Sequence, residues 1–222
     1  MSILFVLITF LLIISISYFL RHGEQPQLAK EQMAGAAPQP PRISREFGFE
    51  IPKGYCFHLG HAWALDEGRQ NARVGLDSLA ANLLGKVDRV EVAGLNRWVR
   101  QGQKICTITS GDVSVDLLSP LEGVVISVNQ DVLKDPNLAL KDPYKDGWIC
   151  VVKAPEMDTN LKNLVQGSMV GPWMQNALRR LTSVTAQLGP AMAQDGGLPV
   201  AGLLRQVEPG VQQAIIHEVF LS

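Results

Sequence analysis

The chain has 222 residues, a formal net charge of -1 and a hydrophobic content of 46%. This length suits one or two modest domains, and the near-neutral charge offers no basic surplus for phosphate contacts, so no nucleic-acid partner is expected. The three cysteines, Cys56, Cys106 and Cys150, are widely spaced and indicate neither a disulfide framework nor a CxxC metal motif. Cys106 and Cys150 lie in apolar runs, where we expect small buried side chains.

The first segment, residues 1–20, contains no charged side chain. About 20 apolar residues at a rise of 1.5 Å cover roughly 30 Å, the thickness of a bilayer core. No basic region precedes the apolar run and no small-x-small site directly follows it, which favours an uncleaved transmembrane anchor over a signal peptide. Because Arg21, His22 and Lys30 follow the run, we expect a single-pass membrane protein with its folded domain on the cytoplasmic side.

The composition then divides the rest of the chain into three parts. Residues 21–46 are polar and small, with a run of prolines near the end, and they predict a flexible linker. Residues 47–182 predict the folded domain with its C-terminal helices. Residues 183–222 predict an extension that ends in an amphipathic helix.

Between Phe47 and Lys153, short apolar or alternating runs are separated by Gly, Pro, Asn and Asp. This punctuation predicts many short strands closing a small barrel or sandwich, with one helix over 77–84 that ends at Gly85. The expected strands beyond that helix are Val87–Val92, Ile105–Thr109, Val124–Asn129 and Trp148–Lys153. The fold class is therefore mainly β with flanking helices.

From Pro155 onward the pattern becomes helical, with an apolar stripe that continues across Pro172. Pro172 either starts a new helix or kinks one. The terminal helix, predicted over Val211–Leu221, ends in the apolar residues Val219, Phe220 and Leu221. An apolar terminus of this kind is unusual in solvent, so we expect it to pack on its own domain or on a partner.

Three motifs carry a resemblance to a known family. They are His61-Ala62-Trp63, the run Ser119-Pro120-x-x-Gly123 after an expected hairpin, and Asp142-Pro143-Tyr144-x-x-Gly147-Trp148. In this order they resemble the glycine cleavage system H protein family, within the lipoyl/biotinyl carrier superfamily. The resemblance covers roughly half the chain and implies a lipoyl-carrier-like barrel-sandwich hybrid.

In that family a lysine at the hairpin tip carries the lipoyl group. Counting back from Ser119-Pro120, the attachment position falls on Asp112, and no Lys or Arg lies between Lys104 and Lys134. A carboxylate cannot form the amide that holds lipoate. The resemblance therefore implies a carrier frame with a degenerate lipoyl position at Asp112, and we expect no cofactor.

No other constellation indicates catalysis. Asp112 and Asp116 are expected in a solvated hairpin without a partner base, and His58 and His61 supply at most two metal ligands. Neither a phosphate loop nor a nucleotide fingerprint occurs. We therefore predict that the protein is not an enzyme and has no metal site and no evident small-molecule substrate.

Three functions remain open from the sequence. The first is a membrane-anchored, non-lipoylated H-protein-like domain that acts as a scaffold or accessory subunit, with other protein subunits and the membrane as partners. The second is a lipoyl-dependent aminomethyl carrier of the glycine cleavage system. The third is a periplasmic membrane-fusion-type adaptor, which usually carries a long helical hairpin that the sequence does not predict.

Overall fold

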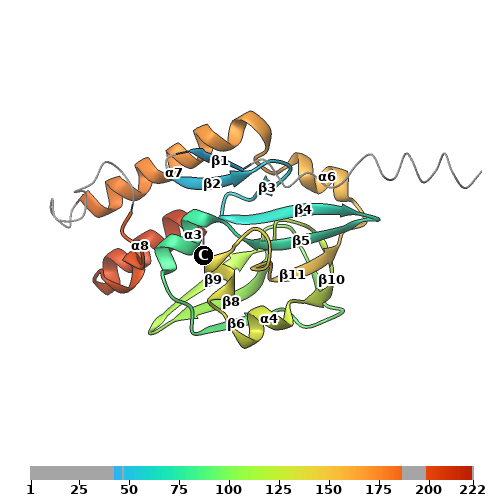
Figure 1. Cartoon of the computed structure of the whole chain (residues 1–222), viewed down its shortest axis with the longest axis horizontal. Helices are drawn as coiled ribbons and strands as arrows, with labels where there is room; N and C mark the ends of the chain where they lie inside the picture. The colour runs from blue at the N-terminus through green and yellow to red at the C-terminus, as the bar shows by residue number, and fades with distance from the viewer. Residues whose placement is uncertain (1–42, 47, 187–198, 222) are drawn as a thin grey trace, which may run out of the picture. The chain divides into compact units, whose positions relative to one another are not determined.

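The structure is a computed structural model of the whole chain, and it describes residues 43–46, 48–186 and 199–221 (Figure 1). The predicted anchor over 1–20 and most of the predicted linker lie outside these ranges. None of the helices within the described ranges combines the length and the apolar character that crossing a bilayer requires. Residues 43–222 form one compact unit.

The described part is mainly β, as the sequence predicts. Its strands are β1 (Ile43–Glu46), β2 (Phe49–Pro52), β3 (Cys56–Phe57), β4 (Ala62–Gly68), β5 (Asn71–Leu76), β6 (Arg89–Val92), β7 (Trp98–Val99), β8 (Lys104–Ser110), β9 (Val113–Leu118), β10 (Gly123–Val128) and β11 (Cys150–Lys153). Strand β1 occupies the last four residues of the predicted linker and pairs with β2.

The helices flank the strands and follow them in the chain. They are α3 (Ser78–Leu84), α4 (Gln130–Lys134), α5 (Leu138–Lys141), α6 (Met157–Lys162), η1 (Gly167–Met169), α7 (Val170–Thr185), η4 (Leu203–Arg205) and α8 (Pro209–Phe220). Pro172 lies in the first turn of α7, where a missing N–H costs nothing, so it marks the start of a helix rather than a kink. The predicted terminal helix is present as α8.

Two antiparallel sheets make the body of the domain. One has the order β3-β4-β5-β11-β10-β7, and the other has the order β6-β8-β9. Both contribute to a single core, in which the largest wholly buried side chains include Trp63, Phe57, Leu76, Ile108, Leu117 and Phe220. This arrangement fits the barrel-sandwich fold that the sequence predicts.

Local sequence signals account for α3. The side chain of Asp77 accepts a hydrogen bond from the N–H of Ala80 at the start of the helix. At the other end Gly85 has a positive φ of 66° and its N–H returns to the carbonyl of Ala81. Both ends of this helix are therefore as the sequence predicts.

The C-terminal extension packs on the domain rather than standing free. Helix α8 contacts α7 and β9, and η4 contacts α3 (Figure 1). The side chains of Ile215, Ile216, Val219 and Phe220 are buried, while Leu221 is exposed. Of the two expectations for the apolar terminus, packing on its own domain is confirmed.

Gly123 is required by close backbone contact. A Cβ there would lie 2.2 Å from the carbonyl oxygen of Lys153 on the neighbouring strand. We expect Gly123→Ala to lower the free energy of unfolding by about 1–3 kcal/mol, since neither strand can move without breaking the ladder. Chemical denaturation with fluorescence detection measures this change.

The matched control is Gly94→Ala, because a Cβ at Gly94 meets no atom within 4 Å. Equal unfolding midpoints for the two variants would show that the contact between Gly123 and Lys153 does not constrain the sheet.

Candidate functional site

Strands β8 and β9 form the hairpin that the sequence predicts, and its tip is a two-residue loop. Ser110 and Val113 make the last pair, so Gly111 and Asp112 connect the strands. Gly111 has a positive φ of 61°, which suits a tight hairpin turn. The side chain of Asp112 is exposed at the tip. The structure therefore places the predicted degenerate lipoyl position at the outermost point of the hairpin.

The tip is held by groups from distant parts of the chain. The N–H of Gly111 donates to Asp88 Oδ2 over 2.7 Å, and Lys86 Nζ lies 3.0 Å from the other oxygen of that carboxylate. A methyl group on Gly111 would come within 3.6 Å of the Arg205 guanidinium, so this arginine of the extension lies beside the tip. The hydrogen bond from Gly111, followed by Lys86 and then Arg205, lowers the pKa of Asp88.

The extension also covers one side of the hairpin. Strand β9 is at the edge of its sheet, and α8 packs beside it. At the end of α8 the carbonyl oxygen of Phe220 comes so near Gly60 that a Cβ there would lie 2.8 Å away. The extension therefore packs against the β9 strand of the hairpin.

His61 and Asp77 form a buried pair that the sequence does not predict. His61 Nδ1 and Asp77 Oδ2 are 2.6 Å apart, and both side chains have no exposed surface. The His61 ring stacks on Trp173, with centroids 4.8 Å apart. His61 Nε2 has no hydrogen-bond partner among the described residues. In the sequence, His61 belongs to the His61-Ala62-Trp63 motif and Asp77 lies at the start of a predicted helix. Only the fold brings the two residues together.

The other predicted residues have structural surroundings. Asp116 is not in the solvated turn: it lies on β9, where it accepts a hydrogen bond from Thr107 Oγ1 over 2.7 Å and pairs with Lys104 over 3.2 Å. His58 Nδ1 accepts a hydrogen bond from the N–H of Gly60, and burial lowers the pKa of the His58 imidazole. In the described part of the chain, no group of three or more His, Cys, Asp or Glu side chains could hold a metal ion.

The cysteines are packing residues. All three are free and buried, as expected for Cys106 and Cys150. Burial raises the pKa of the Cys150 thiol to about 12 and that of Cys106 well above its usual value, so neither forms a thiolate at neutral pH. They offer no nucleophile.

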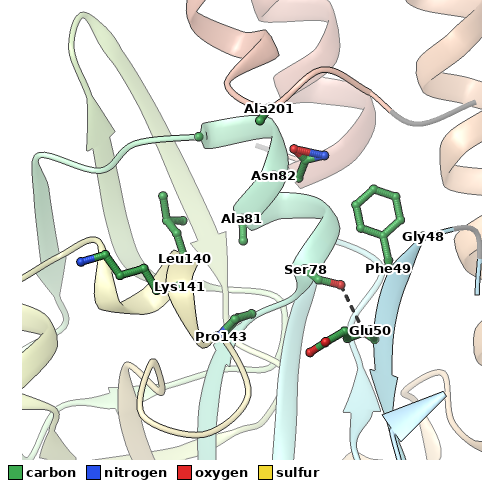
Figure 2. Close-up of a pocket in the computed structure, with 11 residues that line it drawn as sticks. Gly48, Phe49, Glu50, Ser78, Ala81, Asn82, Leu140, Lys141, Pro143 and Ala201 are labelled. Carbon is green, nitrogen blue, oxygen red and sulfur yellow. Dashed lines mark hydrogen bonds between the residues drawn. The ribbon is translucent and has the colours of Figure 1, made fainter. Parts of the chain in front are cut away.

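A cavity of about 560 Å³ lies between β2, α3, α5 with Pro143 after it, and Ala201 of the extension (Figure 2). Its polar lining groups already have partners. Ser78 Oγ donates to the carbonyl of Glu50, Asn82 Nδ2 donates to that of Pro199, and Lys141 pairs with Asp135. Nothing in this lining selects a ligand.

Comparison with known proteins agrees with the fold. The profile of the glycine cleavage H-protein family matches residues 56–176. The glycine cleavage system H protein of Aliivibrio salmonicida is 30% identical over 117 residues, covering 53% of this chain and 92% of the relative. That of Thermus thermophilus is 34% identical over 108 residues, covering 49% and 84%. The chain therefore belongs to the glycine cleavage H-protein family.

A solved structure is also similar. The crystal structure of a glycine cleavage system H protein from Mycobacterium marinum is 24% identical, with a TM-score of 0.47, and the match covers 58% of this chain and 100% of that one. The matched family region ends at residue 176, before η4 and α8 begin. The extension that reaches the hairpin tip is thus outside the family match.

The residues at the tip do not fit a lipoyl group. An amide to lipoate requires a primary amine, and the tip offers Gly111 and the carboxylate of Asp112. Lys86 is the amine brought near the tip by its pairing with Asp88, and Lys104 pairs with Asp116 at the other end of the hairpin. No step through a bound lipoyl group follows from this arrangement.

The pairing at the tip makes a pH-dependent prediction. Because its folded pKa is lowered, the Asp88 carboxylate stabilises the fold above the ordinary Asp pKa, and this contribution is lost as the pH falls through the folded value. We expect the amide resonance of Gly111 to titrate with a midpoint below the ordinary Asp range of about 3.9. An ¹⁵N–¹H NMR titration measures it.

Asp88→Asn is the control, and it should remove that titration from the Gly111 amide. A midpoint at or above the ordinary Asp value would contradict the pairing of Asp88 with Gly111.

The buried pair makes a second prediction. Asp77→Ala removes both the cap of α3 and the partner of His61, and we expect a loss of about 2–4 kcal/mol in the free energy of unfolding. Asp77→Ser keeps an acceptor for the N–H of Ala80 and should cost less. Equal losses for both variants in chemical denaturation would mean that the hydrogen bond from the N–H of Ala80 to the side chain at position 77 adds nothing to the free energy of unfolding.

Proposed function

We propose that this protein is a membrane-anchored H-protein-like domain that carries no lipoyl group and serves as a non-catalytic scaffold or accessory subunit of a membrane protein assembly. The observation that carries the proposal is Asp112 at the hairpin tip, in a domain that otherwise keeps the family's frame. A domain that keeps the family's frame without the attachment amine offers other subunits a rigid binding surface.

The fixed tip supports a static role. A carrier's hairpin has to present its group to more than one partner, whereas this tip is held by Asp88 and lies beside Arg205. Helix α8 packs against β9. Partner subunits would then contact the outer surface formed by the domain and its extension together.

The anchor is the second part of the proposal. The uncharged segment over 1–20 is long enough to span a bilayer, and the basic residues after it favour a cytoplasmic domain. A single-pass protein of this kind holds its folded domain at the membrane surface, near the other subunits of a membrane assembly.

Family membership also favours a second function, a lipoyl-dependent aminomethyl carrier of the glycine cleavage system. This function requires the lipoyl group to be attached at a lysine elsewhere in the chain, since position 112 holds an aspartate. Lys86, whose ammonium group shares the Asp88 carboxylate with the tip, is the lysine to test first.

Intact mass separates the two functions. We expect the full chain, produced together with a lipoate–protein ligase and lipoic acid, to keep its unmodified mass, since a carboxylate at position 112 cannot be acylated. The matched variant Asp112→Lys should gain one lipoyl-sized increment, assigned to position 112 by peptide mapping. This gain would also establish the register of the hairpin.

A lipoyl increment on the unaltered chain, at Lys86 or any other lysine, would contradict the non-carrier function. In the same preparation, a mild-detergent pull-down through a C-terminal tag should recover membrane-protein subunits in stoichiometric amounts. A monomer that is recovered alone in gentle detergent would contradict the scaffold function.

A further inference from the structure

An apolar patch is exposed at one edge of the larger sheet. It consists of Leu95, Trp98 and Ile126, whose side chains are 59%, 47% and 40% exposed. With the two arginines Arg97 and Arg100 it is called the β7 face below. Single exposed apolar residues are ordinary, but three of them in one region, one of which is a tryptophan, mark a contact surface.

Trp98 and Ile126 lie on adjacent strands, and Leu95 lies in the turn before β7. Trp98 lies opposite Val124 in the β7–β10 ladder, and Ile126, two residues further along β10, is the extra residue of a bulge between Val125 and Ser127. Leu95 is at the tip of a turn closed by a hydrogen bond from Arg97 N to Gly94 O of 3.1 Å. The N–H of Asn96 donates to Val125, which fixes this turn against β10.

The charges around the patch are mostly positive. Arg97 and Arg100 are exposed, and within the described ranges neither guanidinium forms an ion pair. Lys153 lies opposite Val124 on the next strand and adds a third cation. Glu122 precedes Gly123, which pairs with Val99, and adds a carboxylate. Arg97, Arg100 and Lys153 thus supply three cations beside the carboxylate of Glu122.

This combination matches the surface of a bilayer. Indole rings favour the membrane–water interface, arginine side chains keep their apolar stems in it while their heads reach phosphates, and cations are attracted to anionic lipid. A stable protein interface buries about 800 Å² on each partner, which is more than three side chains on a turn and an edge strand provide. The remaining tryptophans, Trp63, Trp148 and Trp173, are buried or half-buried.

We propose that the β7 face rests on the anionic surface of the membrane in which the chain is anchored. This inference depends on the proposed anchor. Residues 21–42 can reach at most about 75 Å at roughly 3.4 Å per residue, while a domain of this size has a radius of gyration of about 16 Å. The chain between anchor and domain is therefore long enough for any face of the domain to turn toward the bilayer. It is also short enough to keep the domain near the membrane surface.

The test uses the full chain reconstituted in nanodiscs that contain lipids with brominated acyl chains, which quench nearby indoles. In anionic nanodiscs we expect a blue shift and quenching of the Trp98 emission, and both should be lost in Trp98→Phe. Arg97→Gln with Arg100→Gln should weaken the quenching, as should high salt. Leu59→Ser is the matched control, since Leu59 is 50% exposed next to β3 at the opposite edge of the same sheet.

The outcomes distinguish this inference from the proposed anchor. A chain that enters nanodiscs but shows no Trp98 quenching overturns the membrane contact and leaves the anchor standing. A chain that does not enter nanodiscs overturns the anchor, and the membrane contact falls with it. A blue shift of Trp98 that requires a co-purified protein and is absent in lipid alone overturns the inference in favour of a protein partner.

Discussion

The contact between His61 and Asp77 joins the parts of this domain that depend on one another. Its two side chains have no exposed surface, and the N–H of Asp77 also donates to the carbonyl of His61. One oxygen of Asp77 contacts the imidazole and the other caps α3, while the ring stacks on Trp173 of α7. Sheet, helix and C-terminal helix therefore meet at one buried polar contact, where a lost partner would be costly.

Helix α3 in turn positions the extension. The N–H of Gly202 donates to the carbonyl of Asn82, and a Cβ on Gly85 would collide with Gly202 at 2.4 Å. The short helix η4 begins directly after this contact. It ends at Arg205, which lies beside the hairpin tip. Arg205 is thus brought beside the tip by a contact between α3 and residues beyond the family match.

What the sequence predicts well is local. The helix over 77–84, its end at Gly85 and the hairpin that precedes Ser119 each follow from residue types within a short stretch of chain. What it does not predict is pairing between distant residues, such as Arg205 beside Gly111. Asp116 is a second example: the sequence predicts a solvated hairpin position, but its partners Thr107 and Lys104 lie on the neighbouring strand.

The same division explains why the frame does not depend on the residue at position 112. The frame depends on buried groups such as Trp63, whose indole N–H donates to two carbonyls, and on backbone contacts such as that of Gly123. An exposed side chain at position 112 touches none of them. The packing of the frame therefore places no constraint on the side chain at this position, as is usual for an exposed loop residue.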